Sequence, residues 1–322
     1  MTQALVVHEY GGPEALTPAD MPVAEPGPGQ IRLRHTAIGV NMADTYRRRG
    51  VYPLTLPVII GSEGAGTVAA LGPGVDTLAV GDRVAYAGPL GAYAEERLIA
   101  ADKVVRLPGG IDDRIAAAMM LKGLTVHYLL YWTCAVQPGD TVVIHAAAGG
   151  VGLIFCQWAK HLGATVIGTV GSDEKAALAA RHGCDHPVVY SRENFADRVL
   201  DLTGGEGARA VYDSIGKDTF LESIRCTRAR GVVAGFGQAS GPFPELDTGL
   251  LQGGSKFVTR PGLADHIATR EMIETASARL FDLVERGIVT VNVNQEWPLA
   301  EAAEAHRALE ARATTGSTIL IP

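Results

Sequence analysis

Cysteine is scarce in this sequence, and its four cysteines lie far apart, at Cys134, Cys156, Cys184 and Cys226. No two of them have the CxxC spacing of a zinc ribbon or a redox motif, so neither kind of site is expected. Three of the four lie in apolar or helical-looking sequence, where a buried and reduced thiol is the usual state. This favours a reducing compartment, and residues 1–10 read as a strand rather than a signal peptide. We therefore predict a cytoplasmic protein.

Long apolar runs and an excess of positive charge are also missing. No stretch approaches the roughly 20 uninterrupted apolar residues of a membrane span. The formal net charge of -7 provides no overall attraction to nucleic acid or to an anionic membrane. The sequence also lacks a basic stripe interleaved with aromatic residues, which is typical of nucleic-acid binding. We expect neither a membrane nor a nucleic acid as a partner.

Glycine and proline are abundant in residues 1–110, where they separate short apolar runs. Residues 30–34 alternate polar and apolar side chains, as a half-buried strand does. This pattern predicts a β-rich domain, either a small barrel or a sandwich. The sequence pattern changes from strand-like to helix-like near residue 112, and we predict helices over residues 112–119 and 124–133.

Strands and helices alternate in the middle of the chain. We predict strands at residues 141–145, 165–170, 187–190, 208–213 and 231–236, with helices at 151–162, 173–182, 194–202 and 219–227. This order predicts an α/β fold with a doubly wound parallel sheet covered by helices on both faces. After residue 260 we predict helices at 270–286 and 300–311 and a strand at 317–321, and we expect these elements to rejoin the N-terminal domain.

The first strand of this series leads into a glycine-rich loop, AAAGGVG at residues 146–152. It fits G-x-G-x-x-G with Ala147 in the first glycine place, which requires a negative φ there. Gly149 lets a pyrophosphate approach the backbone, and Gly152 lets the following helix pack closely. The strand–loop–helix context favours dinucleotide binding over a plain tight turn, because the helix start offers free N–H groups to phosphates. We assign cofactor binding here to Ala147, Gly149, Gly150, Val151 and Gly152.

The second strand of the series indicates which cofactor binds. It ends in Gly171 and Ser172, without the carboxylate that would bond both ribose hydroxyls of NADH and repel a 2′-phosphate. Lys175 supplies a positive charge one turn further on, and Tyr190 is the last residue of the third predicted strand, from which it could stack or bond near the same phosphate. Asp173 and Glu174 weaken the local positive field. Ser172 also has a structural interpretation as the N-cap of the next helix, and Lys175 as a solvated helix residue, and both interpretations are compatible with phosphate binding. We predict NADPH rather than NADH.

Six segments, in this order along the chain, carry a resemblance to a known family: NMADTY (41–46), GSEGAG (61–66), LKGLT (121–125), AAAGGVG (146–152), VYDSIG (211–216) and RATTGS (312–317). The chain resembles the zinc-free, zeta-crystallin-like quinone oxidoreductases of the medium-chain dehydrogenase/reductase superfamily. Within that family it is most similar to bacterial NADPH:quinone reductases. The segments span the whole chain and are far more specific than the glycine loop alone.

The resemblance implies a GroES-like β-barrel domain at residues 1–123, a Rossmann domain at 124–262 and a return to the first domain at 263–322, with the active site between the domains. It implies that Asn41, Tyr46, Tyr52 and Thr125 lie near the nicotinamide and the substrate. Family members are commonly homodimers or homotetramers, paired through the Rossmann sheet edge. Further cofactor contacts are implied at Ser172, Lys175, Tyr190, Ser214, Phe236, Gly237, Phe257, Val258 and Arg312.

The residues at the positions of the superfamily's catalytic zinc ligands are poor zinc ligands in this sequence. They are Asn41 and Ser62, and Glu63 alone does not make a site. We therefore expect no metal. Without a Lewis acid an alkoxide is poorly stabilised, whereas a quinone is already electrophilic and needs mainly positioning. The hypothesis is direct hydride transfer to a quinone or a conjugated enone, with Asn41, Tyr46 and Tyr52 orienting the carbonyl and a tyrosine or water supplying the proton.

Several of these residues also have purely structural interpretations. Asn41 is a plausible helix cap, and Tyr46 and Tyr52 are plausible surface residues. His127 and His145 read as satisfied helix and strand residues, and the arginine run at 47–49 reads as a solvated face. Two other functions stay open: an enone or enoyl double-bond reductase, and a non-catalytic NADPH-binding protein of the crystallin or RNA-binding kind.

Overall fold

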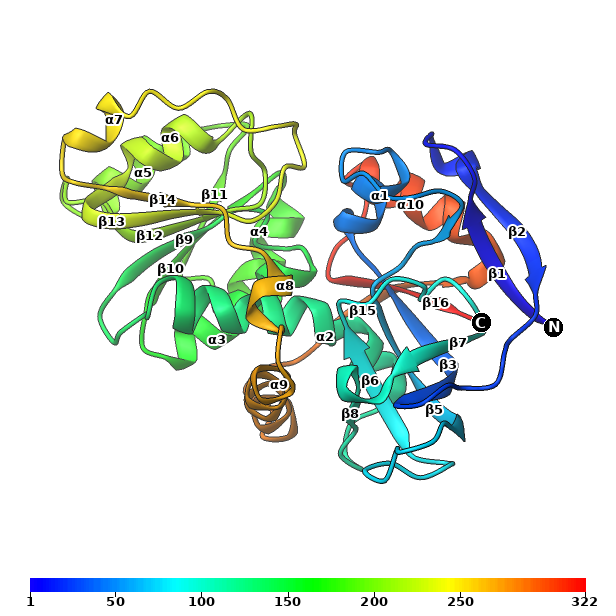
Figure 1. Cartoon of the computed structure of the whole chain (residues 1–322). Coiled ribbons are helices and arrows are strands. Elements are labelled where there is room, and N and C mark those ends of the chain that lie inside the picture. The colour runs from blue at the N-terminus through cyan, green and yellow to red at the C-terminus, as the bar shows by residue number, and fades with distance from the viewer. The chain divides into compact units, whose positions relative to one another are not determined.

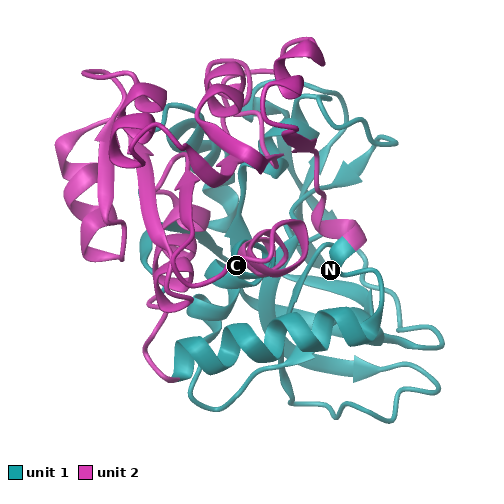
Figure 2. Cartoon of the chain, turned by 90° about the vertical axis from the view of Figure 1, so that its left-hand side faces the viewer, with its two compact units in different colours: residues 1–124, 266–285, 291–322 teal, residues 125–265, 286–290 magenta.

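The computed structural model describes all 322 residues and contains two compact units (Figure 2). Unit 1 comprises residues 1–124, 266–285 and 291–322, and unit 2 comprises residues 125–265 and 286–290. The domain ranges expected from the resemblance stay a prediction. No helix is long and apolar enough to cross a membrane.

Unit 2 is built on a six-stranded sheet in which all neighbouring strands are parallel. The spatial order is β11-β10-β9-β12-β13-β14, which is the doubly wound order 3-2-1-4-5-6. This confirms the predicted parallel sheet. The strands are β9 (Thr141–Ile144), β10 (Thr165–Val170), β11 (His186–Val189), β12 (Ala208–Asp213), β13 (Thr227–Gly235) and β14 (Phe257–Thr259).

Helices cover both faces of this sheet, with α5 and α6 on one face and α3 on the other (Figure 1). Val143, Ile167, Val188 and Val211 come from four strands and are at most 1% exposed, so they form a continuous apolar layer. The helices that follow the strands are α3 (Gly150–His161), α4 (Asp173–Arg181), α5 (Phe195–Leu202), α6 (Phe220–Arg225), α7 (Gly249–Gln252) and α8 (Leu263–His266).

Unit 1 is mostly antiparallel β-structure. A seven-stranded sheet has the order β15-β16-β3-β5-β6-β8, with β7 also paired to β3, and a second sheet has the order β2-β1-β4. Alternate residues of β3 (Gln30–Val40) are buried at its start, as the alternating sequence predicts. The other strands are β1 (Thr2–Val7), β2 (Leu16–Met21), β4 (Val58–Ile59), β5 (Glu63–Leu71), β6 (Arg83–Ala87), β7 (Glu96–Ala100), β8 (Val105–Arg106), β15 (Val293–Pro298) and β16 (Ser317–Ile321). The helices are α1 (Met42–Arg48), α9 (Arg270–Glu285) and α10 (Ala302–Glu310).

The helix pair expected at residues 112–119 and 124–133 is wrong. A single helix, α2 (Asp113–Tyr128), runs from the first range into the second without a break and continues as a π-helical turn over Leu129–Thr133. Gly123 lies inside the helix because it makes room for a neighbour: a Cβ there would lie 2.4 Å from Cδ2 of Leu280 in α9. Thr227, expected at a helix end, is instead the first residue of β13.

The interpretation of residues 47–49 as a solvated run is wrong for Arg48, although Arg49 is exposed. Arg48 is 1% exposed, and its Nη2 donates hydrogen bonds to both carboxylate oxygens of Glu310, at 2.8 and 2.9 Å. Its Nη1 donates to Nδ1 of His306 at 2.9 Å, so the ring proton of His306 is on Nε2, which lies 2.7 Å from the hydroxyl of Tyr93. Burial, followed by the charge of Arg48, lowers the pKa of His306 to about 3. The hydrogen bonds of Arg48 to His306 and Glu310 therefore connect α1 to α10.

Candidate active site

The glycine-rich loop joins β9 to α3 in unit 2. Its left-handed residue is Ala146, with a φ of 54°, whereas Ala147 keeps the negative φ that its place in the motif requires. The N–H of Ala147 donates to the carbonyl of Thr169 in β10 at 3.0 Å. A Cβ at Gly168 would lie 2.6 Å from the Cβ of Ala147, so the methyl group of Ala147 occupies space that Gly168 leaves free.

Two glycines of the loop are required for different reasons. At Gly152 a Cβ would lie 2.4 Å from the carbonyl oxygen of Ala146 and 2.6 Å from the backbone of Ala147, so the packing of the helix against the loop excludes any side chain. At Gly149 the backbone is extended, and a Cβ would meet only the carbonyl oxygen of Ala146, at 3.3 Å. Packing within the protein therefore requires glycine at position 152. At position 149 a side chain would contact only one atom of the protein, so the space on that side of the backbone is largely open.

The start of α3 fits the phosphates of a dinucleotide. Gly149 is the N-cap residue, and no side chain caps the helix. The first-turn N–H groups, those of Gly150, Val151 and Gly152, have no acceptor within the helix because they precede its first complete turn. The positive end of the helix dipole and the open space above Gly149 together favour an anion there.

The tip of β10 carries the residues expected near a 2′-phosphate. Ser172 is the N-cap of α4, and its Oγ accepts a hydrogen bond from the N–H of Lys175 at 3.3 Å, so the capping interpretation holds. The hydroxyl of Tyr190 would lie 2.9 Å from a Cβ at Gly171, so the fold brings Tyr190 over this tip. Tyr190 is 49% exposed and remains accessible to a ligand.

Sequence reasoning missed Arg192 at the same tip. Its guanidinium forms an ion pair with Asp173, the first residue of α4, and both side chains are largely exposed. The two residues are separated by β11 in the sequence. The only available signal was the basic residue two positions after Tyr190.

Ser214, Phe236 and Gly237 lie at the carboxyl ends of β12 and β13, where a doubly wound fold binds its ligand. A Cβ at Gly237 would lie 2.7 Å from the carbonyl oxygen of Ser214, so these two loops touch. Both loops are organised by Asp213, whose carbonyl accepts from the N–H of Phe236 at 2.9 Å. The structure therefore brings together three of the residues expected from the resemblance.

His145 and Asp213 form a buried polar network beneath the glycine loop. Nδ1 of His145 lies 2.8 Å from Oγ1 of Thr169, and Nε2 lies 3.0 Å from Oγ of Ser223. The Ser223 hydroxyl in turn lies 3.0 Å from Oδ2 of Asp213. Burial lowers the pKa of His145, which agrees with the interpretation of this histidine as a satisfied strand residue.

In unit 1, Asn41 belongs to a buried ionic cluster. Its Nδ2 donates to Oε2 of Glu63 at 2.9 Å, and the Nζ of Lys122 donates to the same oxygen at 2.8 Å. The second oxygen of Glu63 accepts from the N–H of Leu121 at 2.8 Å. Gly39 permits this close packing, since a Cβ there would lie 2.2 Å from Oε2 of Glu63. Lys122 had been assigned no role from the sequence, and it supplies the positive charge that balances Glu63.

Asn41 also begins α1, as its capping interpretation predicts. Its N–H donates to Oδ2 of Asp44 at 2.9 Å. Burial raises the pKa of Asp44 to about 6, and the neighbouring guanidinium of Arg47 opposes that rise. Nη1 of Arg47 donates to Oγ of Ser62 at 2.8 Å. The side chains of Asn41 and Ser62, at the places of the two zinc ligands, are thus hydrogen-bonded to other residues of the protein. No group of three or more His, Cys, Asp or Glu side chains is arranged to hold a metal ion.

The two expected tyrosines are neighbours in unit 1. The rings of Tyr46 and Tyr52 meet edge to face, with centroids 5.3 Å apart, and Tyr46 is 5% exposed while Tyr52 is half-buried. Tyr46 is therefore not the surface residue that the structural interpretation proposed. Thr125 is a buried residue of α2 in unit 2.

Like all the other expected cofactor contacts, Phe257, Val258 and Arg312 stay predictions. Phe257 and Val258 lie in β14, the last strand of the sheet, and Phe257 is 59% exposed. They pair with Val232 and Val233, so they precede the carboxyl end of the strand. Arg312 follows α10 in unit 1 and has a left-handed backbone, with a φ of 58°.

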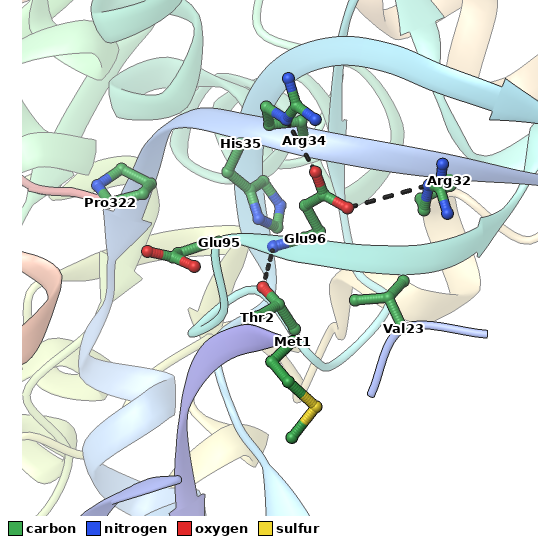
Figure 3. A pocket seen from close by; sticks show the side chains of 9 residues that line it. All are labelled: Met1, Thr2, Val23, Arg32, Arg34, His35, Glu95, Glu96 and Pro322. Carbon is green, nitrogen blue, oxygen red and sulfur yellow. Dashed lines mark hydrogen bonds and ion pairs between the residues drawn. The ribbon is translucent and has the colours of Figure 1, made fainter. Parts of the chain in front are cut away.

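A cavity of about 450 Å³ in unit 1 contains none of the expected site residues (Figure 3). Its arginines are paired: Nε of Arg34 donates to Oε1 of Glu96 at 2.7 Å, and Nε of Arg32 lies 3.8 Å from Oε2 of Glu96. The lining is charged rather than apolar, so it offers little to a planar hydrophobic substrate. Its lining residues are Met1, Thr2, Val23, Arg32, Arg34, His35, Glu95, Glu96 and Pro322.

Two family models match the chain. One, described as the alcohol dehydrogenase GroES-like domain, matches residues 27–109, and the other, described as a zinc-binding dehydrogenase, matches residues 150–276. They confirm the predicted fold class, a GroES-like domain combined with a Rossmann domain.

Comparison with known proteins identifies similar full-length chains. The chain is 52% identical to a quinone oxidoreductase of Pseudomonas aeruginosa, with 100% of both chains covered. It is 47% identical to a 2-haloacrylate reductase of a Burkholderia species, over 100% of this chain and 99% of that protein. The crystal structure of Escherichia coli quinone oxidoreductase complexed with NADPH matches with a TM-score of 0.97 at 46% identity, covering 99% of this chain and 100% of that one.

Proposed function

The chain belongs to the zeta-crystallin-like quinone oxidoreductases of the medium-chain dehydrogenase/reductase superfamily, and from this we propose that it is an NADPH-dependent quinone reductase that works without a metal. The observation that carries the proposal is the glycine loop. Its third glycine is demanded by packing, whereas the space above Gly149 is open and faces an uncapped helix start. This is the arrangement that a pyrophosphate needs.

Unit 2 supplies the residues that would hold NADPH. The N–H groups at the start of α3 bind the pyrophosphate, and Ser172, Lys175 and Tyr190 contact the 2′-phosphate at the tip of β10. Ser214, Phe236 and Gly237 line the carboxyl ends of the next strands, and Thr125, Phe257 and Val258 complete the proposed contacts of this unit. Arg312, which belongs to unit 1, is also an expected cofactor contact. When bound, the cofactor supplies the hydride for the acceptor.

Unit 1 supplies the residues that would orient the acceptor. Glu63 fixes the amide of Asn41, because it accepts a hydrogen bond from Nδ2, and the ammonium group of Lys122 donates to the same carboxylate oxygen. The hydroxyls of Tyr46 and Tyr52 donate hydrogen bonds to the carbonyl oxygen. A quinone needs little further help, since its reduction yields an aromatic phenolate of low basicity, and the proton comes from a tyrosine or from water.

A second candidate is an NADPH-dependent reductase of activated double bonds, and the 2-haloacrylate reductase found among the relatives favours it. The two proposals are separated by measuring NADPH oxidation by the purified protein with a naphthoquinone, with an enone and with a 2-haloacrylate. We expect the largest kcat/KM with the quinone. Turnover of the enone or haloacrylate without any turnover of the quinone would show the first proposal to be wrong.

A site variant tests whether the proposed residues carry the reaction. Tyr52→Phe removes one hydroxyl and leaves the ring against Tyr46, so we expect the kcat for the quinone to fall about tenfold, the effect typical of one lost hydrogen bond. The KM for NADPH should stay unchanged. The comparison variant is Tyr10→Phe, because the hydroxyl of Tyr10 donates to the carbonyl of Leu54 and accepts from its N–H, and so holds the segment that carries Tyr52 without belonging to the proposed site. A smaller loss of kcat in Tyr10→Phe than in Tyr52→Phe would separate the role of the Tyr52 hydroxyl from that of the segment's position.

We further propose a homodimer paired through an edge of the parallel sheet. β14 is an edge strand, so its outer backbone groups are available for pairing with another chain, and Phe257 on it is 59% exposed. Light scattering during size-exclusion chromatography would give the mass in solution. We expect the mass of two chains, and a wild-type mass of one chain would contradict the proposal. The predicted cytoplasmic location likewise stays a prediction.

A further inference from the structure

We propose that Arg192 is a further residue that determines specificity for the 2′-phosphate. When no phosphate is bound, the carboxylate of Asp173 forms an ion pair with the guanidinium of Arg192 in its place. The proposal rests on the proposed function, because it concerns the same cofactor. It adds Arg192 to the phosphate contacts that the family resemblance implies, together with the exchange of the Asp173 carboxylate for the phosphate. The observation behind it is the ion pair between the guanidinium of Arg192 and the carboxylate of Asp173.

The position of Arg192 is set by the turn that follows β11. The N–H of Tyr190 donates to the carbonyl of Val170 at 3.2 Å, and the N–H of Arg192 donates to the carbonyl of Val189 at 2.9 Å. This turn folds back over the tip of β10, where the hydroxyl of Tyr190 would lie 2.9 Å from a Cβ at Gly171. Tyr190 and Arg192 therefore reach the same strand tip, at which a doubly wound fold recognises the adenosine ribose.

Two donors at this tip, Arg192 and Ser172, are occupied by the protein's own carboxylates. Arg192 binds Asp173, and the hydroxyl of Ser172 donates to Glu174, which lowers the pKa of that carboxyl. Both carboxylates belong to the first turn of α4, whose dipole also favours negative charge. The two side chains thus take the place that a dianionic phosphate would fill.

Exchange of Asp173 for a phosphate favours NADPH for electrostatic reasons. Arg192 and Asp173 are 60% and 66% exposed, and an ion pair in contact with water contributes little stability, so opening it is easy. A phosphate carries more charge than a carboxylate and accepts two parallel hydrogen bonds from a guanidinium. NADH has only a hydroxyl at that position, so it leaves the Arg192–Asp173 pair intact and gains nothing from Arg192.

The experiment measures binding directly, by fluorescence titration of the full-length protein with NADPH and with NADH. Arg192→Ala should raise the Kd for NADPH about tenfold and change the Kd for NADH by less than about twofold. Asp173→Asn should lower the Kd for NADPH and leave that for NADH unchanged, because it removes the competing carboxylate. Arg198→Ala is the matched control: Arg198 is an exposed arginine of α5 whose guanidinium lies 3.9 Å from the carboxylate of Glu193.

Each outcome bears on one proposal. If wild-type protein binds NADPH no more tightly than NADH, the cofactor preference in the proposed function is wrong. If the wild type prefers NADPH and Arg192→Ala keeps that preference, only the role of Arg192 is overturned. An equal loss of both affinities in Arg192→Ala would also overturn it, since the effect would then be structural. A second titration, with adenosine 2′,5′-bisphosphate against adenosine 5′-monophosphate, isolates the 2′-phosphate and should reproduce the same pattern.

Discussion

The ammonium nitrogen of Lys122 lies 2.8 Å from Oε2 of Glu63, and both side chains are buried in unit 1. A buried ion pair contributes little net stability when it is intact, because desolvation offsets the attraction. Loss of one partner, in contrast, leaves an uncompensated charge. The pair also fixes Asn41, whose Nδ2 shares the same carboxylate oxygen.

Lys122→Met should therefore destabilise the protein by about 3–5 kcal/mol, the usual effect of breaking a buried pair. The double variant Lys122→Met/Glu63→Gln should recover much of that loss, because it removes both charges together. Chemical denaturation of the three proteins would measure the free energies of unfolding. A double variant less stable than Lys122→Met alone would contradict the assigned role of the pair.

His306 predicts a loss of stability in acid. Its pKa falls from the ordinary 6.5 to about 3 in the folded protein, so between these values the unfolded chain binds one more proton. Stability is therefore complete above pH 6.5 and is lost as the pH falls toward 3. His306→Gln keeps an acceptor for Arg48 and a donor for Tyr93, and it should reduce the slope of unfolding free energy against pH by about 1.4 kcal/mol per unit between pH 4 and 6. An unchanged slope would show that His306 does not titrate in this way.

Asp44 predicts the opposite sign in the same range. Its pKa rises from 3.8 to about 6 on folding, so the folded protein binds one more proton and this group favours folding at lower pH. Asp44→Asn can still accept the N–H of Asn41, and it should increase the slope by about 1.4 kcal/mol per unit between pH 4 and 6. Denaturation curves at several pH values would measure it. A slope that decreases in this variant would mean that the pKa of Asp44 is not raised.

Much of the fold could be predicted because its signals are local. The strand 165–170, the helix stops at glycines and the capping role of Ser172 all depend on residues within a few positions of one another. The glycine loop was recognisable for the same reason. The expected helix break before residue 124 was wrong because Gly123 serves a distant neighbour, Leu280, whose side chain packs where a Cβ would be.

The candidate site was less predictable because its charge pairs join distant residues. Lys122 and Glu63 are 59 positions apart, and Arg48 and Glu310 are 262 apart, so periodicity could not relate them. The arginine run was therefore interpreted as solvated, although Arg48 is buried. The Arg192–Asp173 pair is separated by a whole strand and helix, and only the parallel pairing of β10 with β11 brings it together.

The two glycines of the loop should respond differently to the same substitution. Gly152→Ala places a methyl group against the backbone of Ala146 and Ala147, and it should cost about 3 kcal/mol or more of stability. Gly149→Ala meets one atom at 3.3 Å and should change stability by about 1 kcal/mol, while NADPH affinity falls at least about tenfold. Denaturation and cofactor titration measure the two effects. If Gly149→Ala folds and binds NADPH normally, the pyrophosphate does not lie above this glycine.

Lys175 should discriminate between the two nicotinamide cofactors. Its N–H is bound by the cap residue Ser172, which places Lys175 in the first turn of α4 beside the tip of β10. Its ammonium group would pair with a 2′-phosphate and has no corresponding partner in NADH. Lys175→Ala should therefore raise the KM for NADPH about tenfold and that for NADH by less than about twofold, with kcat unchanged for both. Lys160→Ala is the control, since Lys160 is an exposed lysine of α3 paired with Asp185. An equal increase in both KM values would remove Lys175 from the phosphate site, because an ammonium group that binds the 2′-phosphate has to distinguish the cofactors that differ only there.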